Sequence, residues 1–391
     1  MKYHNTIFRQ MLQLFSRLEF QNIVNHYKGD HRVRTLKCWD QFIYLMFGQF
    51  SKRDSLRDTI DTMNSQYRKF YHLGTTHLCR STLSDANNNR NWRIYQDLYF
   101  KIFKRVQCVA PKYKLKLNRK FYILDSTTID LCLKLFPWAR FRKTKAAVKI
   151  HALMQADGSL PTFVQMTDGK VHDTTVAKEM DIPKGSYLVI DRAYHDFKQY
   201  KSYNDNEIRF VTRKKTNAKY TVVKSLKVDE STGVISDDIV EFTGYQTHKK
   251  YPYPLRTIRY LDNETEKELE FLTNDFELDS LTITKIYKAR WEIELFFKTI
   301  KQNLKIKRFI GTSANAVWTQ IWIAMIAYLI VSYLKFVHKL KVSLQKLFHR
   351  IQINLFERKP LTEVIVNRKF VPPNIDDNFQ FCLFGSLTGH Y

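Results

Sequence analysis

Two short apolar runs end in the same way, and together they restrict the fold more than any other feature of the chain. Phe121–Leu124 is followed by Asp125, and Tyr187–Ile190 is followed by Asp191. A run of four apolar residues is typical of a strand that is buried on both faces, as in the sheet of an α/β domain. A carboxylate at the end of such a strand lies near the core, where a charge must be paired or bind a metal ion. The two Asp residues are 66 positions apart, which leaves room for a hairpin and a crossover helix between neighbouring strands.

Changes of pattern divide the chain into five segments. Residues 1–110 repeat apolar side chains at helical spacing and predict a small all-helical domain. Residues 111–208 alternate like strands and contain both Asp-terminated runs, which predicts the first part of an α/β domain. Residues 209–272 contain short alternating stretches and predict a β-rich insertion. Residues 273–337 return to helical spacing and predict the second part of the α/β domain, and residues 338–391 form a C-terminal tail of mixed pattern.

The stretch 284–301 predicts one amphipathic helix with a polar row beside an apolar stripe. At 3.6 residues per turn, one narrow face holds Tyr287, Arg290, Glu294 and Lys301. The neighbouring stripe consists of Ile286, Ile293, Phe297, Ile300 and Leu304. A solvated Arg–Glu pair is the ordinary alternative, but such pairs seldom lie beside a buried stripe in register with a Tyr and a Lys. We therefore expect packing to hold the polar row against the body of the domain.

These motifs resemble those of bacterial transposases of the insertion-sequence-4 family. Asp125, Asp191 and Glu294 correspond to the DDE triad of that family. The pattern Tyr287-x2-Arg290-x3-Glu294-x6-Lys301 has the spacing of its Tyr-Arg-Glu-Lys signature in full. The gap of 103 positions between Asp191 and Glu294 is also similar, and the resemblance covers roughly residues 119–333.

The resemblance implies a fold of known type. It implies an α/β ribonuclease-H-like catalytic domain, interrupted by a β-rich insertion and preceded by a small all-helical DNA-binding domain. One departure is Ala193, where many members have Gly after the second Asp of the triad. This departure concerns the backbone of the loop and leaves the carboxylate of Asp191 in place.

The resemblance also implies an activity, which is binding of the terminal inverted repeats of an insertion sequence followed by metal-dependent cleavage and strand transfer. Asp125, Asp191 and Glu294 form a set of oxygen ligands that suits Mg²⁺, with Mn²⁺ as a substitute. Two such ions activate a water or a 3′-hydroxyl and stabilise the leaving oxygen. The other three signature residues are expected to clamp a DNA phosphate, and a homodimer is expected on the paired DNA ends.

The charge of the chain points independently to double-stranded DNA. With 64 Lys and Arg against 38 Asp and Glu, the formal net charge is +26. Residues 1–120 contain 23 basic and 8 acidic residues, so more than half of this excess lies in the first third. We expect that third to dock on DNA, because neutralising phosphate is the commonest use of such a field. Within it, residues 80–90 are either a helix that reads DNA or, more commonly for such a sequence, a solvated helix end.

Other classes of protein are disfavoured by what the sequence lacks. The five Cys residues show no CxxC spacing, and the chain contains no HExxH, Walker or GxGxxG motif, so a disulfide framework, a zinc site and nucleotide-driven chemistry are not expected. The N-terminus has no signal-peptide pattern, which favours the bacterial cytoplasm. The uncharged stretch 309–334 is long enough to span a bilayer, but its polar residues favour a buried core helix that starts near Ser313 and no membrane contact.

Weaker candidates lie near the predicted site. His172 and Asp173 follow a predicted strand, and Lys149 and His151 share one face of another strand. Each of these residues has an ordinary structural alternative, and so do the aromatic side chains of the insertion, which are typical of a small core as well as of base stacking.

Two functions compete with transposition. A DNA endonuclease on the same fold would cut without joining ends, and a strand-transfer assay separates it from a transposase. An inactive or domesticated DNA-binding protein derived from a transposase would lack metal-dependent nicking, although the intact triad argues against this alternative.

Overall fold

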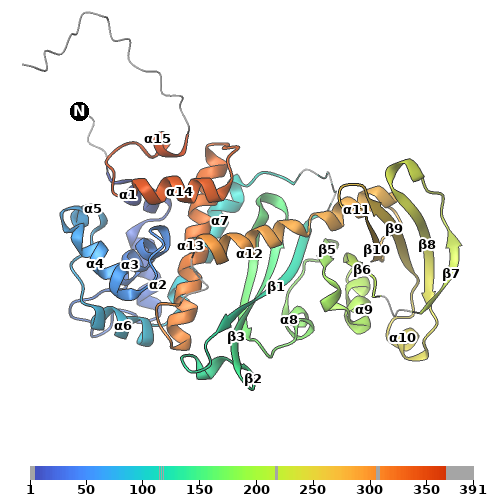
Figure 1. Ribbon diagram of the computed structural model, residues 1–391, viewed down its shortest axis with the longest axis horizontal. Coiled ribbons are helices and arrows are strands. Elements are labelled where there is room, and N and C mark those ends of the chain that lie inside the picture. The colour runs from blue at the N-terminus through green and yellow to red at the C-terminus, as the bar shows by residue number, and fades with distance from the viewer. Residues whose placement is uncertain are drawn as a thin grey trace, which may run out of the picture.

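A mixed sheet of ten strands runs across the molecule from a helical half to a β-rich edge (Figure 1). The computed structural model describes residues 5–113, 115, 117, 119–215, 219–304 and 309–366. The strand order is β2-β3-β1-β5-β6-β10-β9-β8-β7, and β4 pairs with the free side of β3. The strands are β1 (Phe121–Leu131), β2 (Arg140–Arg142), β3 (Lys145–Gln155), β4 (Leu160–Asp168), β5 (Tyr187–Ile190), β6 (Arg209–Arg213), β7 (Tyr220–Ser225), β8 (Val234–Phe242), β9 (Leu255–Asp262) and β10 (Lys267–Thr273).

The two apolar runs pair with each other as parallel strands at the centre of the sheet. Phe121 lies opposite Tyr187, and Leu124 lies opposite Ile190. Alternate residues of both runs face two separate apolar clusters, one on each side of the sheet, which explains why all eight side chains are buried. The parallel register places Asp125 and Asp191 at the same end of neighbouring strands.

The end of β1 differs from the prediction. The sequence predicts that the strand stops at Leu124, whereas β1 continues through Asp125 to Leu131. It continues because its other edge is paired with β3 as far as Leu131, which lies opposite Ala146. Continuous burial, in contrast, ends where the prediction placed it, since the side chains from Asp125 to Thr128 are partly exposed and only Ile129 is buried again.

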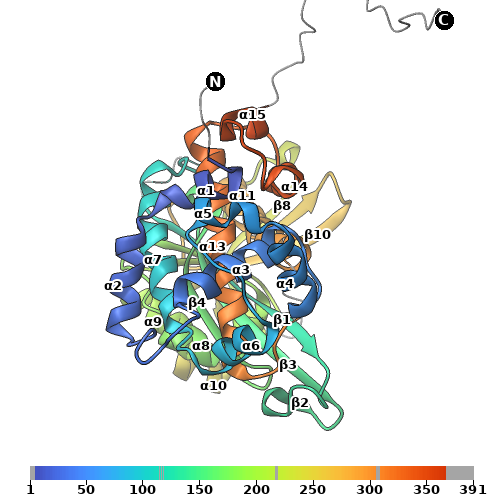
Figure 2. The same cartoon turned by 90° about the vertical axis from the view of Figure 1, so that its left-hand side faces the viewer.

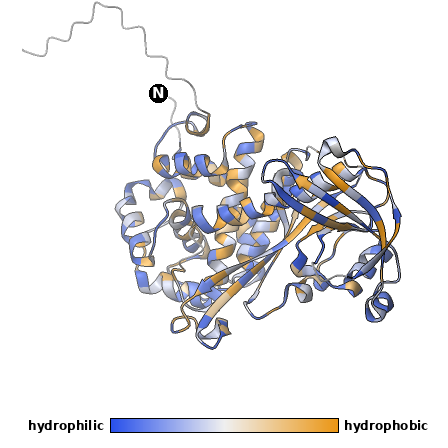
Figure 3. Cartoon of the chain, turned by 45° about the vertical axis from the view of Figure 1, so that its right-hand side comes forward, coloured by the Kyte–Doolittle hydropathy of each residue, from blue (hydrophilic) through white to orange (hydrophobic). Residues whose placement is uncertain are grey.

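The β-rich segment is an extension of the same sheet. Its first strand, β6, pairs in parallel with β5 and therefore belongs with the central strands, although the sequence places residue 209 in the insertion. The meander of β7, β8, β9 and β10 is antiparallel and joins the sheet through the β6–β10 pair. Helix α10 (Tyr245–Lys250) lies between β8 and β9. Figure 3 shows hydrophobic residues along the strands of this continuous sheet.

The helices are distributed unevenly over the chain. Those before the sheet are α1 (Ile7–Met11), α2 (Arg17–His26), α3 (Cys38–Phe50), α4 (Leu56–Ser65), α5 (Phe70–Leu73), α6 (Arg80–Asn89) and α7 (Arg93–Val109). Those within or after it are α8 (Asp173–Glu179), α9 (Phe197–Asp205), α11 (Ser280–Lys288), α12 (Trp291–Asn303), α13 (Ala314–Val337), α14 (Leu344–Asn354) and α15 (Leu361–Ile365). No strand occurs among the described residues before 121, as the helical spacing of residues 1–110 predicts.

The uncharged stretch forms the central helix of the molecule. Helix α13 starts after Ser313, whose hydroxyl accepts a hydrogen bond from the N–H of Ala316, at the predicted position. In the described part of the chain it is the one helix long and apolar enough to cross a membrane, yet most of it is buried inside the protein. It packs against α3, α6 and α7 (Figure 2). The expectation of a buried core helix is therefore confirmed.

The N-terminal helices and the sheet share one apolar core. Trp322 of α13 lies 6.5 Å from Trp92, 5.3 Å from Tyr99 and 6.0 Å from Phe100, measured between ring centroids. The same cluster continues through α12 to the face of the sheet. The C-terminal part closes on the N-terminal helices, since the N–H groups of Ile7 and Phe8 donate to carbonyl groups just after α14. The last part of the predicted tail, residues 367–391, lies outside the described residues.

Replacement of Trp322 should therefore destabilise the whole protein as one unit. Trp322→Ala removes the aromatic contact between α13 and α7 and leaves a cavity, so the free energy of unfolding should fall by about 3–5 kcal/mol. Trp291→Ala is the matched control, because Trp291 is 60% exposed. Guanidinium denaturation followed by circular dichroism and by fluorescence measures both variants. A separate transition of the N-terminal helices that Trp322→Ala leaves unchanged would contradict the shared core.

Candidate active site

Two carboxylates lie side by side where the pairing of β1 with β5 ends, Asp125 within β1 and Asp191 directly after β5. Asp125 accepts a hydrogen bond from the backbone N–H of Ser126 at 2.8 Å. Asp191 accepts one from the N–H of Arg192 at 2.8 Å and caps the short 3₁₀ turn Arg192–Tyr194. Each carboxylate is thus oriented by the amide of the next residue. Ligand sites of α/β sheets commonly lie at this edge, outside the carboxyl ends of the strands.

Glu294 reaches the same site from α12, which packs against β1. The guanidinium group of Arg290 joins the two elements, with Nη2 2.5 Å from Glu294 Oε1 and Nη1 3.5 Å from Asp125 Oδ2. The five residues of the apolar stripe predicted on this segment are all buried and attach the helix to the core. Packing thus holds Arg290 and Glu294 against Asp125, as predicted.

The predicted single helix is interrupted in the middle of the signature. Helix α11 ends at Lys288 and α12 begins at Trp291. At the junction, the N–H of Arg290 donates to the carbonyl of Tyr287, and the N–H of Ile293 donates to the carbonyl of Arg290, so the bonds are of the tighter i→i−3 type. Such a break inside a helical segment often marks a functional site.

The break separates the four signature residues that the sequence places on one face. Tyr287 lies before it, buried against Phe271, with its ring 5.8 Å from the guanidinium carbon of Arg290. Its hydroxyl has no hydrogen-bond partner among the described residues. Lys301 lies further along α12, where its ammonium group donates to the carbonyl of Thr128 at 2.8 Å. The signature residues are therefore spread along β1, with Arg290 at Asp125 and Lys301 further along the strand at Thr128.

Negative charge is crowded at this site. Burial, together with the nearby charges of Asp191 and Glu294, raises the pKa of the Asp125 carboxyl to about 6. The amide of Ser126 and the guanidinium of Arg290 act in the opposite direction. Asp191 and Glu294 are therefore close enough to interact electrostatically with Asp125. A site of this kind favours a cation, because a positive charge relieves the repulsion between the carboxylates.

The donor chemistry of the site fits a divalent metal ion. The three carboxylates offer only oxygen ligands, which Mg²⁺ and Mn²⁺ prefer. Within the described ranges, no three His, Cys, Asp or Glu side chains are gathered closely enough to hold an ion in the present arrangement. In this arrangement the guanidinium of Arg290 forms ion pairs with both Asp125 and Glu294.

A second polar cluster lies next to Asp125 and is linked to it through Ser126. Asp173, at the start of α8, accepts a hydrogen bond from Ser126 Oγ at 2.5 Å and from Lys149 Nζ at 3.2 Å. His151 Nδ1 lies 3.4 Å from the same carboxylate, and its Nε2 lies 3.0 Å from Thr167 Oγ1. Three of the weaker sequence candidates thus meet in one network, whereas His172 is exposed.

Ser126 also belongs to the site, although no sequence motif includes it. It directly follows Asp125, and its backbone amide and side-chain hydroxyl connect the carboxylate of Asp125 with that of Asp173. The network therefore fixes the backbone that orients the first Asp of the site.

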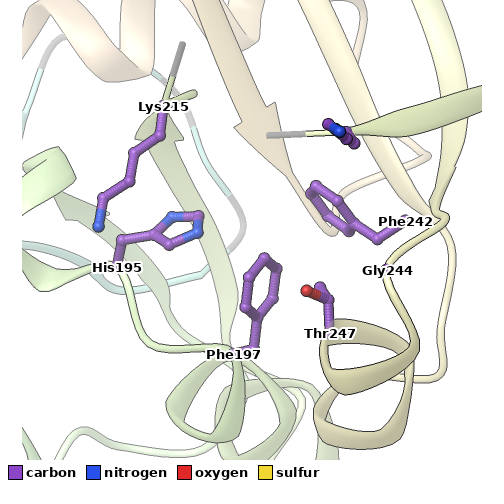
Figure 4. A pocket seen from close by; sticks show the side chains of 7 residues that line it. His195, Phe197, Lys215, Phe242, Gly244 and Thr247 are labelled. Carbon is purple, nitrogen blue, oxygen red and sulfur yellow. The ribbon is translucent and has the colours of Figure 1, made fainter. Parts of the chain in front are cut away.

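A hollow of 380 Å³ lies beyond the loop that follows Asp191. Figure 4 shows the rings of His195, Phe197 and Phe242 around it. The remaining lining residues are Lys215, Lys219, Gly244 and Thr247. Burial and the charge of Lys215 lower the pKa of the His195 imidazole to about 4, so this ring is neutral at physiological pH. Phe242 is one of the aromatic residues of the insertion that the sequence suggested for base contacts, and it lines the hollow.

Comparison with known proteins gives a consistent result. Residues 116–330 match the family described as the transposase DDE domain, and residues 3–76 match a domain family of unknown function. The protein y4zB of Sinorhizobium fredii, named as a transposase, is 31% identical over 287 residues, which is 72% of this chain and 79% of that protein. The mixed sheet with helices on both faces, together with the DDE match, fits the expected ribonuclease-H-like fold.

Two further relatives are also named as transposases of insertion sequences. That of element IS5377 from Geobacillus stearothermophilus is 27% identical and covers 85% of this chain and 86% of its own length. That of element IS4SA from a Synechocystis species is 27% identical and covers 70% of this chain and 76% of its own length. The similarity thus extends over most of the chain.

Loss of the Asp173 charge should destabilise the protein in a pH-dependent way. Burial raises the pKa of Asp173, but the nearby His151 imidazole and the hydrogen bonds from Ser126 and Lys149 outweigh burial and hold this pKa well below its usual range. A carboxylate with a lowered folded-state pKa stabilises the protein above its unfolded pKa and loses this effect as the pH falls. At neutral pH, Asp173→Asn should therefore lower the free energy of unfolding by about 2–3 kcal/mol.

Urea denaturation at several pH values measures the effect. The difference between Asp173→Asn and the unmodified protein should be constant at neutral pH and shrink below about pH 4. Asp168→Asn, at an exposed position, is the control. A difference that does not change with pH would show that the charge of Asp173 contributes nothing to stability.

Proposed function

The chain belongs to the DDE transposase family, and on this premise we propose that it is the transposase of a bacterial insertion sequence. It binds the terminal inverted repeats of its element and moves the element by cut-and-paste cleavage and strand transfer. The observation that carries this proposal is the parallel register of β1 and β5, which sets Asp125 and Asp191 side by side facing Glu294. The work takes place in the bacterial cytoplasm, on double-stranded DNA.

Asp125, Asp191 and Glu294 are the proposed ligands of two Mg²⁺ ions, for which Mn²⁺ may be exchanged experimentally. When bound, such ions activate a water or a 3′-hydroxyl and stabilise the leaving oxygen. The protein contributes by orienting its ligands in advance. The amides of Ser126 and Arg192 fix the carboxylates of the two Asp residues, and α12 carries Glu294 to them on a buried apolar stripe.

Arg290 has two successive partners in this proposal. In the structure its guanidinium neutralises Asp125 and Glu294. When a DNA end and its metal ions arrive, the planar fork turns to a phosphate of the DNA, for which its geometry is well suited. Tyr287 and Lys301 act with it as the DNA clamp, Tyr287 from the helix break and Lys301 from the later part of α12. Two protomers pair the two ends of the element as a homodimer on DNA.

Removal of a single carboxylate should abolish cleavage without preventing DNA binding. Asp191→Asn keeps the size of the side chain and its place as the cap of the following turn but removes the charge that holds the metal ions. A plasmid that carries the gene with its flanking DNA is the substrate, and nicking is followed over a Mg²⁺ and Mn²⁺ series. Asp181→Asn, at an exposed position, should cleave normally. Cleavage by Asp191→Asn at the normal rate would refute the metal assignment.

Replacement of Arg290 should lower the cleavage rate but raise the affinity for Mn²⁺ in the absence of DNA. Arg290→Gln loses a charge-assisted contact with phosphate, which corresponds to a cleavage rate about 10- to 100-fold lower. The same change removes the cation that competes for Asp125 and Glu294, so Mn²⁺ should bind more tightly in the absence of DNA. Electron paramagnetic resonance of free Mn²⁺ measures the affinity.

The control for this pair of effects is Lys285→Gln, which removes the same charge from an exposed position on α11. It should change neither the cleavage rate nor the Mn²⁺ affinity. If Arg290→Gln weakened Mn²⁺ binding, the guanidinium would support the metal site instead of competing with it.

A further inference from the structure

An open groove of 650 Å³ lies between the first turns of α4 and α6, in the basic third of the chain and away from the candidate active site. Its lining residues are Ser55, Leu56, Arg57, Arg80, Ser81, Ser84, Asp85 and Ile310. Helix α6 lies between the two segments that match known families, residues 3–76 and 116–330. The comparisons therefore assign no role to it.

Two arginines line the groove without a polar side-chain partner among the described residues. Arg57 and Arg80 are exposed, and neither forms an ion pair or a side-chain hydrogen bond with a described residue. Neighbouring arginines differ from them, because Arg53 pairs with Asp58 at 3.2 Å and Arg90 donates to Gln41 at 3.3 Å. The two groove arginines are thus available for an external anion.

Between these arginines, α6 presents a face of short polar side chains. Ser81, Ser84, Asp85 and Asn88 are spaced at i, i+3, i+4 and i+7, so they form one row along the helix. No large apolar side chain is exposed on α6, and its opposite face is buried through Leu83. Short side chains with donors and acceptors allow a helix to come close to a polar surface and to form hydrogen bonds with it.

The position of this face is fixed by hydrogen bonds at the other end of α6. Gln41 of α3 donates to the side chain of Asn87 at 2.8 Å in the core. Asn315 of α13 donates to the carbonyls of Asn87 and Arg90 at 2.8 and 2.6 Å. Because α13 also packs against α12, the polar row is held rigidly relative to the helix that carries Glu294.

We infer that α6 reads the sequence of the transposon end in the major groove of DNA, with Arg57 and Arg80 on the phosphates beside it. This inference rests on the proposed function and adds the element that gives it sequence specificity. The major groove admits an α-helix, and Ser81, Ser84 and Asp85 of the row supply hydrogen-bonding groups for base edges. Asp85 is the most informative of these, since a carboxylate in the major groove accepts a hydrogen bond from the amino group of cytosine. Asn88 helps to anchor the helix, since its Oδ1 accepts a hydrogen bond from the Ser313 hydroxyl at 2.7 Å.

Replacing the groove arginines and replacing the polar residues of α6 should have different effects on DNA binding, and both effects can be measured with the full-length protein. The probe is a pool of DNA duplexes with a randomised centre, from which the unmodified protein selects its preferred sequence. Arg57→Gln and Arg80→Gln should weaken binding to selected and unselected duplexes alike, and each should reduce the slope of log affinity against log salt by about one. Arg57→Lys keeps the charge and should restore most of the affinity for both classes of duplex.

Asp85→Asn and Ser84→Ala should instead change the selected sequence. Asp85→Asn should lose the preference for cytosine at one position, with a discrimination about tenfold weaker there, and the salt slope should stay nearly the same. Circular dichroism and thermal unfolding should match those of the unmodified protein, because the replaced side chains are exposed or half-exposed.

Each other outcome overturns the inference in a recognisable way. If the unmodified protein selects a sequence and all α6 and α4 variants select and bind it equally well, another element reads the DNA, and the proposed function survives. If Arg34→Gln, an exposed control outside the groove, lowers affinity as much as Arg80→Gln, the charge acts diffusely and the groove is not a site. If the unmodified protein binds no duplex at any salt concentration, both this inference and the proposed function fail.

Discussion

Parallel pairing of β1 with β5 is the contact on which the rest of the structure depends. Both strands are buried on two faces, so their only polar side chains near the core are those that follow the apolar runs. The register that aligns Leu124 with Ile190 sets Asp125 and Asp191 at the same sheet edge. A shift of one residue would move each side chain to the opposite face of the sheet, and no arrangement of the helices could then bring the carboxylates together.

The three carboxylates repel one another, and Arg290 beside the start of α12 offsets this repulsion. Burial raises the pKa of Asp125, and its acidic neighbours raise it further. The break between α11 and α12 places Arg290 at the first turn of α12, where its guanidinium reaches both Asp125 and Glu294. A cation supplied by the protein thus offsets the repulsion among these carboxylates. The apolar stripe on α12 and the core around α13 provide the packing that keeps these charges in place.

The sequence predicted the features that depend on local patterns. The run Tyr187–Ile190 forms β5 with those bounds, the uncharged stretch becomes the buried α13, and the resemblance to DDE transposases of insertion sequences is confirmed. The features it missed depend on pairing across long distances. The extension of β1 to Leu131 follows from its pairing with β3, and the helix break before Arg290 is not visible in a periodic pattern. The roles of the individual site residues stay predictions.

The central claim is that Asp125, Asp191 and Glu294 form one metal site from which Arg290 is displaced when the metal ions bind. Anomalous diffraction from crystals of the full chain grown with Mn²⁺ tests this claim most directly. The predicted result is Mn²⁺ density bounded by the three carboxylates, with the Arg290 guanidinium away from both Asp125 and Glu294. Mn²⁺ density elsewhere, or a guanidinium still paired with both carboxylates beside a bound ion, would contradict it.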